Sequence, residues 1–190
     1  FFPSKNLGAY GDGGALFTNE DDLAHALRGI VNHGMYQRYH HDVVGVNSRL
    51  DAMQAAILDV KLSYLDSYNE ARKAAALQYN ARLSGHQKIV TPFREGDCDS
   101  HVYHQYTLRL LDTDRDAVVK KMGEKNIPTG VYYPIPLHAQ KAYKDPRYRP
   151  EDFPVTLQMT KEVISLPMHT ELSTAQIDYI CTHLMDAINS

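Results

Sequence analysis

The chain opens with the stretch that decides its interpretation, residues 1–15, which read FFPSKNLGAYGDGGA. Lys5 stands just after Pro3 and is followed by Gly8, Gly11, Gly13 and Gly14. A lysine that forms a Schiff base must be neutral often enough to attack a carbonyl, and glycines leave room for a flat group beside it. Most lysines, however, are exposed and solvated, and a Walker phosphate-binding loop has a different order of glycine and lysine. On spacing alone, an ordinary exposed lysine is the better interpretation of Lys5.

The composition is that of a globular protein with no affinity for nucleic acid. The 190 residues are 43% hydrophobic and 23% charged, and the formal net charge is -3. The two cysteines, Cys98 and Cys181, exclude a disulfide framework and suit a reducing cytosol, so we expect a cytoplasmic protein. The sequence shows neither a membrane-spanning apolar run nor a signal peptide. Because it begins with Phe1-Phe2-Pro3 rather than Met, we also expect a fragment of a longer protein.

The first part of the chain predicts a strand, a helix and a loop, followed by one long helix. The strand covers residues 15–18, and the first helix begins within 19–22 and ends near 32–34. Residues 35–47 have no period and are expected to form a loop. The long helix begins near Asp51, which pairs with Gln54 as in a capping box, and runs to Leu83 before Gly85. At about 1.5 Å per residue it spans roughly 50 Å, so we expect it to link two domains, residues 1–65 and 66–190.

The remainder predicts a small α/β domain. Strands are expected at 101–111, 129–133 and 164–166, and helices at 113–125 and 156–163. Prolines mark residues 134–154 as rich in loops. A final helix begins at a capping box of Ser173 and Gln176, with its buried stripe at Ile177, Ile180, Cys181, Leu184 and Ile188.

The histidines do not form a metal-binding pattern. Among the ten, His40 and His41 are adjacent, and His101 and His104 are three residues apart. In a strand that second spacing places the two rings on opposite faces. No further cluster has the spacing of a metal site, so we predict no metal.

Three ordered motifs resemble one enzyme family over the whole chain. The first is the Lys5 stretch; the second is GVNSRLD at 45–51 followed by QAA at 54–56; the third is YYPIPLH at 132–138. All three are similar to motifs of the DegT/DnrJ/EryC1/StrS aminotransferases, enzymes that use pyridoxal phosphate (PLP) to aminate keto-sugars carried on nucleotides. The resemblance implies PLP-dependent transferase fold type I, with part of a large domain in 1–65 and a small C-terminal α/β domain in 66–190.

The resemblance also implies roles for individual residues. Lys5 forms the Schiff base with PLP and moves a proton between the substrate carbon and the cofactor. Asn47 reaches across the interface of a homodimer to the phosphate of the partner's PLP. Arg49, Tyr132, Tyr133 and His138 contact the nucleotide-sugar. Each has a structural alternative: Asn47 as a turn or helix-entry residue, Arg49 as an exposed cation, and one of the two tyrosines as a packing residue, since neighbours in a strand face opposite ways.

The implied reaction moves an amino group, from glutamate, to a nucleotide-linked keto-sugar for polysaccharide or antibiotic sugar synthesis. The pattern Pro-x-Lys-Asn-Leu-Gly favours a 3-keto-sugar. Family residues that hold the pyridine nitrogen and the ring lie before the lysine, so the chain by itself is expected to be inactive. The alternative is a non-catalytic sugar-binding or regulatory module of the same fold. Some relatives are dehydratases with histidine at the lysine position, and Lys5 argues against that activity.

Overall fold

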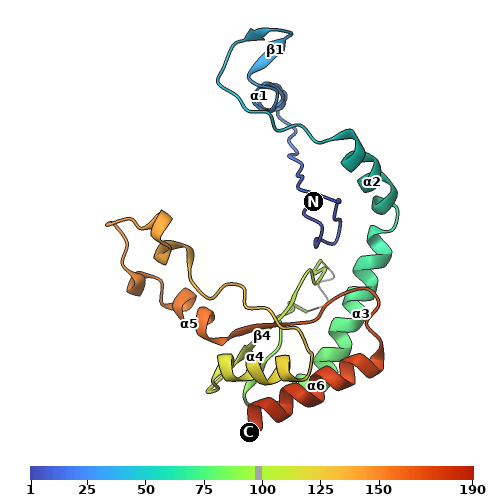
Figure 1. Cartoon of the computed structure of the whole chain (residues 1–190), viewed down its shortest axis with the longest axis vertical. Coiled ribbons are helices and arrows are strands. Elements are labelled where there is room, and N and C mark those ends of the chain that lie inside the picture. Colours follow the sequence, from blue (N-terminus) through green and yellow to red (C-terminus); the bar gives the residue numbers. More distant parts are fainter. Residues whose placement is uncertain (97–99) are drawn as a thin grey trace. The chain divides into compact units, whose positions relative to one another are not determined.

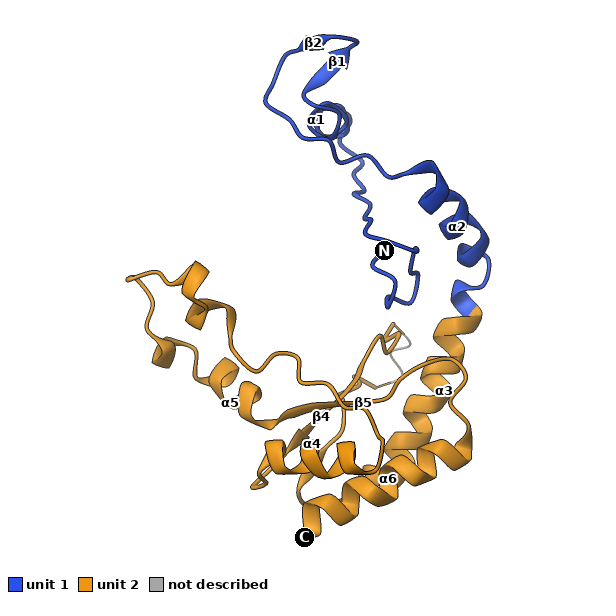
Figure 2. Cartoon of the chain, viewed as in Figure 1, with its two compact units in different colours: residues 1–66 blue, residues 67–190 orange. Residues whose placement is uncertain are grey.

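The computed structural model describes residues 1–96 and 100–190, and the chain divides into two compact units, 1–66 and 67–190 (Figures 1 and 2). Cys98 lies outside the described residues, whereas Cys181 is buried. The two units differ in character: the first is built of short elements and extended segments, and the second has a continuous core. Their assignment as part of a large cofactor domain and a small C-terminal domain stays a prediction.

The part of unit 1 that precedes residue 50 contains a helix followed by a hairpin. The helix, α1 (Asp21–Val31), has two carboxylates in its first turn, where they complement the helix dipole. It ends where His33 and Gly34 take positive φ values of 61° and 75°. The loop prediction for 35–47 was wrong in part, because β1 (Met35–Gln37) and β2 (His40–His41) pair antiparallel. Strands this short leave no recognisable alternation in the sequence.

The predicted strand at residues 15–18 does not form. Among the described residues, no strand pairs with this segment, which runs extended with Leu16 71% and Phe17 92% exposed. The segment is extended, as its apolar composition predicts. A β-strand, however, also needs a neighbouring strand with which it exchanges backbone hydrogen bonds.

The predicted long helix is two helices, α2 (Ala52–Leu62) and α3 (Leu65–Leu83). The break lies at Ser63, whose hydroxyl donates to the carbonyl of Val60 at 2.7 Å and so competes with the helical ladder. The Asp51–Gln54 capping box was wrong too: Asp51 precedes the helix but makes no side-chain cap, and Gln54 bonds elsewhere. Gly85, with φ of 89°, ends the helical run as predicted.

Unit 2 centres on an antiparallel sheet of order β3-β4-β5, made of β3 (Ile89–Val90), β4 (Tyr106–Leu110) and β5 (Val163–Leu166). Tyr106, Leu108 and Leu110 alternate into the core as predicted. The strand is shorter than the predicted 101–111 because Tyr103 takes a φ of 45°, which no strand accommodates. The strand predicted at 129–133 is reduced to a bridge between Gly130 and Ser165, since prolines at 128 and 134 flank it.

The helices of unit 2 are α3, α4 (Arg115–Glu124), α5 (Pro154–Glu162) and α6 (Thr174–Asn189), all at or near the predicted positions (Figure 1). The Ser173–Gln176 capping box is confirmed, with both reciprocal bonds present, and so is the buried stripe of α6. The proline-rich stretch holds three single-turn helices, η1 (Leu137–Ala139), η2 (Lys141–Tyr143) and η3 (Pro150–Asp152). Helix α5 ends at Glu162 and strand β5 begins at Val163, with no connecting residue.

The core of unit 2 lies between the sheet and helices α3, α4 and α6. Tyr79 of α3 stacks on Tyr106 of β4, with ring centroids 4.7 Å apart. Burial raises the pKa of both phenols, and each hydroxyl has a partner: Tyr79 donates to the carbonyl of Pro167 and Tyr106 donates to the Oδ1 of Asn80. The described helices include none that is long and apolar enough to cross a membrane.

Candidate functional site

Lys5 projects from a loop whose ends are tied together. The amide of Lys5 donates to the carbonyl of Phe2 at 2.9 Å, and the amide of Ala9 donates to the carbonyl of Phe1 at 2.8 Å. Gly8 closes the loop at very short range, because a Cβ at this position would lie 2.3 Å from the carbonyl oxygen of Pro3. Lys5 itself is exposed, and in the part of the chain that the structure describes no hydrogen bond or ion pair engages its ammonium group. The amine is therefore available for chemistry on a loop whose backbone is closely packed.

Helix α2 holds this loop through two residues that the sequence did not identify as functional. Gln54 accepts a hydrogen bond from the amide of Tyr10 at 2.8 Å, and Lys61 donates to the carbonyl of Gly8 at 2.5 Å. Both belong to unit 1. Their spacing, with buried Leu58 between them, was the available signal, since residues four and three apart share one helical face.

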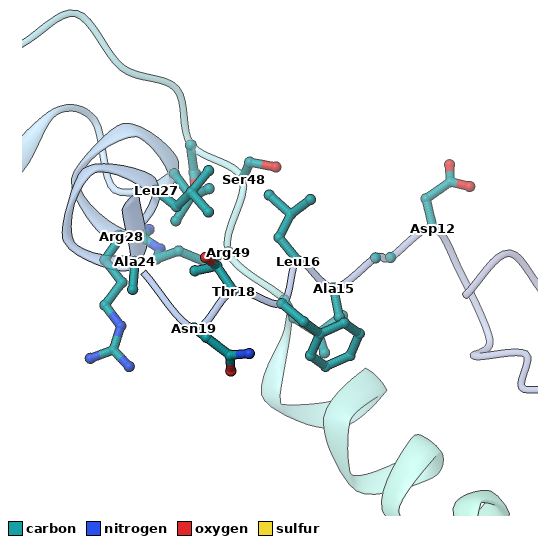
Figure 3. A pocket seen from close by; sticks show the side chains of 16 residues that line it. Asp12, Ala15, Leu16, Thr18, Asn19, Ala24, Leu27, Arg28, Ser48 and Arg49 are labelled. Carbon is teal, nitrogen blue, oxygen red and sulfur yellow. The ribbon is translucent and has the colours of Figure 1, made fainter. Parts of the chain in front are cut away.

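Asn47 and Arg49 lie together in a hollow of about 1130 Å³ beside α1. Figure 3 shows the extended segment that follows Asp12, the helix with Ala24, Leu27 and Arg28, and the chain at Ser48 and Arg49. Lys5 is not among the lining residues, which are Asp12, Gly13, Gly14, Ala15, Leu16, Phe17, Thr18, Asn19, Ala24, Leu27, Arg28, Val31, Asn47, Ser48, Arg49 and Leu50. Two of the predicted site residues, Asn47 and Arg49, therefore line the same hollow, and the guanidinium group of Arg28 is a second cation there.

The segment that carries Asn47 and Arg49 is fixed to the end of α1. The amides of Val46 and Ser48 donate to the carbonyls of Ile30 and Val31, at 2.8 and 2.9 Å. These carbonyls belong to the last turn of the helix, which needs partners from outside the helix. Arg49 donates to the Oδ1 of Asn32 at 2.8 Å, so it is a cation at a helix C-terminus, where the dipole favours it. Asn47 remains exposed, with its backbone bridged to Asn32.

Tyr132 and Tyr133 line a second hollow, of about 560 Å³, within unit 2. They are 45% and 72% exposed, and their rings meet edge to face with centroids 5.6 Å apart. Because the segment is not a strand, the alternation that would place them on opposite faces does not apply, and both line the hollow. The remaining lining residues come from the following loop and from α5 and its end: Pro134, Ile135, Pro136, Leu137, Gln140, Val155, Thr156, Met159, Thr160 and Val163.

His138 is not among the residues that line this hollow. Its ring packs on Phe153 with centroids 4.5 Å apart, and its Nε2 is buried with no hydrogen-bond partner in the part of the chain that the structure describes. A buried unpartnered ring nitrogen is uncommon, because leaving such an atom unsatisfied costs about 1–3 kcal/mol.

Two arginines fix the α5 wall of the second hollow. Arg115, 8% exposed, donates through Nη1 to the carbonyls of Thr160 and Val163 at 3.2 and 3.0 Å. Arg109 forms an ion pair with Glu162 at 2.8 Å. A hydrogen bond from Gln158, together with the Arg109 guanidinium, lowers the pKa of the Glu162 carboxyl. Within the described residues, no group of three or more histidine, cysteine or acidic side chains is arranged to hold a metal ion.

Comparison with known proteins gives a single consistent result. The model of the DegT/DnrJ/EryC1/StrS aminotransferase family matches residues 1–185. A curated Pseudomonas aeruginosa protein, UDP-2-acetamido-2-deoxy-3-oxo-D-glucuronate aminotransferase, is 47% identical over 97% of this chain and 49% of its own length. The pleiotropic regulatory protein of Geobacillus stearothermophilus is 46% identical over 95% of this chain and 48% of its own.

The solved structures agree with the sequence comparison. The crystal structure of S. venezuelae DesV, in complex with a ketimine intermediate, superposes with a TM-score of 0.93 at 35% identity, over 100% of this chain and 50% of its own. Other matching structures hold the cofactor as PMP, the amine form of PLP. The expected α/β aminotransferase fold is thereby confirmed. The chain spans about half the length of the curated relatives it matches.

Proposed function

Because the chain belongs to the DegT/DnrJ/EryC1/StrS aminotransferase family, we propose that the protein carrying it transfers an amino group to a keto-sugar linked to a nucleotide, with PLP as cofactor. The observation that carries this proposal is Lys5, an exposed amine that has no partner among the residues that the structure describes, on a loop that is otherwise tightly bonded. A nucleophilic lysine needs a free amine and a fixed position, and this loop supplies both.

The residues of unit 1 fit PLP at two points. When bound, the cofactor supplies an electron sink for charge that develops at the substrate carbon. Lys5 would be the residue that holds the cofactor covalently, and its amine would hold and return the proton at that carbon. The Asn47 amide is suited to donate to a phosphate oxygen, and the guanidinium groups of Arg28 and Arg49 in the same hollow favour an anion.

We assign Asn47 to the cofactor phosphate in the partner subunit of a homodimer. Two features support this assignment. Lys5 is not among the residues that line the hollow of Asn47, although both lie in unit 1, and the Asn47 side chain is exposed rather than used in packing. Val43, Val44 and Val46, just before it, are 44%, 98% and 57% exposed, and a group of exposed apolar side chains beside a polar binding group is typical of an interface.

We assign the nucleotide-sugar to Arg49, Tyr132, Tyr133 and His138. The two tyrosines offer hydroxyl groups and ring faces in a mostly apolar hollow, which suits a ligand with both rings and hydroxyls. The Nε2 of His138, which has no hydrogen-bond partner among the described residues, could bond to a ligand oxygen once it is exposed. The P. aeruginosa relative is named for a 3-oxo sugar, which supports a 3-keto substrate here. We further propose glutamate as donor, a cytoplasmic location, and polysaccharide or antibiotic sugar synthesis as the pathway.

The decisive experiment reduces the full-length protein with borohydride in the presence of PLP and maps the modified peptide. We expect the adduct on Lys5, and we expect Lys5→Ala and Lys5→Arg to lose both the adduct and amino transfer, because a guanidinium stays protonated and does not attack. An adduct that persists at another lysine in Lys5→Ala would remove the assignment.

The name of the G. stearothermophilus relative supports a second candidate, a regulatory module of the same fold. The same experiment separates the two, since a module without catalysis leaves Lys5 unmodified.

A further inference from the structure

Two side chains on one face of α2 bind the backbone of the loop that presents Lys5. We infer that Gln54 and Lys61 are positioning residues for Lys5: they fix the segment Gly8–Tyr10 and, through it, the placement of the amine. The inference rests on the proposed function of Lys5, whereas the two hydrogen bonds from α2 are observed independently of that function.

One α2 side chain donates a hydrogen bond and the other accepts one, and both bond to backbone groups of the same short segment. Lys61 Nζ donates to the carbonyl of Gly8 at 2.5 Å, and Gln54 Oε1 accepts from the amide of Tyr10 at 2.8 Å. Leu58, 7% exposed, lies between them on the same face. Two turns of helix separate Gln54 from Lys61, about 10 Å along the axis, so two long side chains converge on backbone groups two residues apart.

Lys61 is held more firmly than an ordinary surface lysine. Its ammonium is also 5.8 Å from the centroid of the Tyr10 ring, within the range of a cation–π interaction. Its hydrogen bond is charge-assisted and belongs to the stronger class. The α2 contacts therefore hold the loop at two successive points, the carbonyl of Gly8 and the amide of Tyr10.

The loop backbone connects these two contacts to the position of Lys5. Gly8 packs against the carbonyl of Pro3, and Ala9 bonds to Phe1, so a shift of Gly8–Tyr10 displaces both ends of the turn in which Lys5 stands. Among the described contacts, neither Gln54 nor Lys61 bonds to Lys5 itself. Their role is thus to place the lysine, not to react.

The amide of Ala9 gives a readout independent of activity. It bonds to Phe1 and to neither α2 side chain, so its hydrogen exchange reports how often the loop opens. A hydrogen bond to a charged group corresponds to about a ten- to hundredfold change in an equilibrium constant. We expect Lys61→Met to accelerate exchange at Ala9 by that factor, and Gln54→Leu by about tenfold, since its bond is neutral.

The experiment compares these variants in the full-length protein with Lys61→Arg, which keeps a charged donor, and Gln54→Glu, which keeps an acceptor. Exposed Lys120 on α4 gives the matched control, Lys120→Met. We expect Lys61→Met and Gln54→Leu to speed exchange at Ala9 and to slow the appearance of borohydride-trapped PLP on Lys5. The two conservative variants should restore both readouts, and Lys120→Met should change neither.

Three results would overturn the inference: unchanged exchange at Ala9 in Lys61→Met and Gln54→Leu, faster exchange with an unchanged rate of adduct formation, or equal damage in the conservative variants. A wild-type protein that forms no adduct on Lys5 refutes the proposed function instead. Exchange at Ala9 then decides alone whether α2 fixes the loop.

Discussion

Arg72 holds three parts of unit 2 together, and its removal gives a stability change that can be worked out from its contacts. Its Nη1 lies 3.2 Å from each of the carbonyl oxygens of Tyr103, His104 and Met168. The side chain is buried among them at 9% exposure, and desolvation lowers the pKa of its guanidinium. One guanidinium nitrogen carries two hydrogens, so three acceptors share two full hydrogen bonds. At about 1.5–3 kcal/mol each, and at the long end of the distance range, the pair contributes about 3 kcal/mol.

We therefore expect Arg72→Met, which keeps the packing of the stem, to destabilise unit 2 by about 3 kcal/mol. Protection of the β4 amides against hydrogen exchange should fall about a hundredfold, since each 1.4 kcal/mol is a factor of ten. Exchange is the suitable assay because it reports on this unit alone within the full-length protein. Lys120→Met is the control. A loss of protection smaller than about threefold would show that the three carbonyls find other partners and that the reasoning from Nη1 is wrong.

Two further predictions concern the homodimer and pH. Asn47→Ala should weaken PLP binding by about ten- to hundredfold without unfolding the protein. If each site is shared between two subunits, mixing Lys5→Ala with Asn47→Ala chains should restore part of the activity, because one site of the mixed dimer then carries neither substitution. If no activity returns, Asn47 serves the site of its own subunit. Since the folded-state pKa of Glu162 is lowered, its stabilisation is present above the pKa of the unfolded state, near 4.3, and is lost as pH falls through the folded value. Glu162→Gln should therefore cost about 1 kcal/mol at pH 7 and progressively less as the pH falls through the folded-state pKa of Glu162, measured as β5 amide protection. A cost that stays the same across the acid range would mean that the charge is irrelevant.

Periodicity and capping patterns predicted the helices of unit 2 and its buried faces, because those features depend on residues close in sequence. The Ser173–Gln176 box and the α6 stripe are examples. Failures occurred where distant chain decides the outcome. Residues 15–18 had a strand's composition without a partner strand, and Gln54 looked like a capping residue but bonds to Tyr10, far away in sequence.

The candidate site was identified largely through resemblance, since spacing alone favoured an ordinary lysine at position 5. Gln54 and Lys61 could not be identified from the sequence because both bind backbone groups. Lys61 binds a carbonyl group, and a carbonyl leaves no trace in residue identity. His138 was grouped with Tyr132 and Tyr133 by adjacency, yet its ring packs on Phe153, fifteen residues later, and it does not line their hollow.

Because helix α5 is followed by strand β5 without a connecting residue, the wall that α5 forms in the second hollow is rigidly joined to the sheet. With no residue between Glu162 and Val163 to absorb a rotation, α5 swings only if β5 twists or the Arg115 bonds to Thr160 and Val163 break. A one-residue shift of β5 against β4 would turn every β5 side chain to the opposite face. Length variation and adaptive movement are therefore confined to the other wall, the chain from Tyr132 through the single-turn helices, where a ligand of different size can be accommodated without disturbing the core.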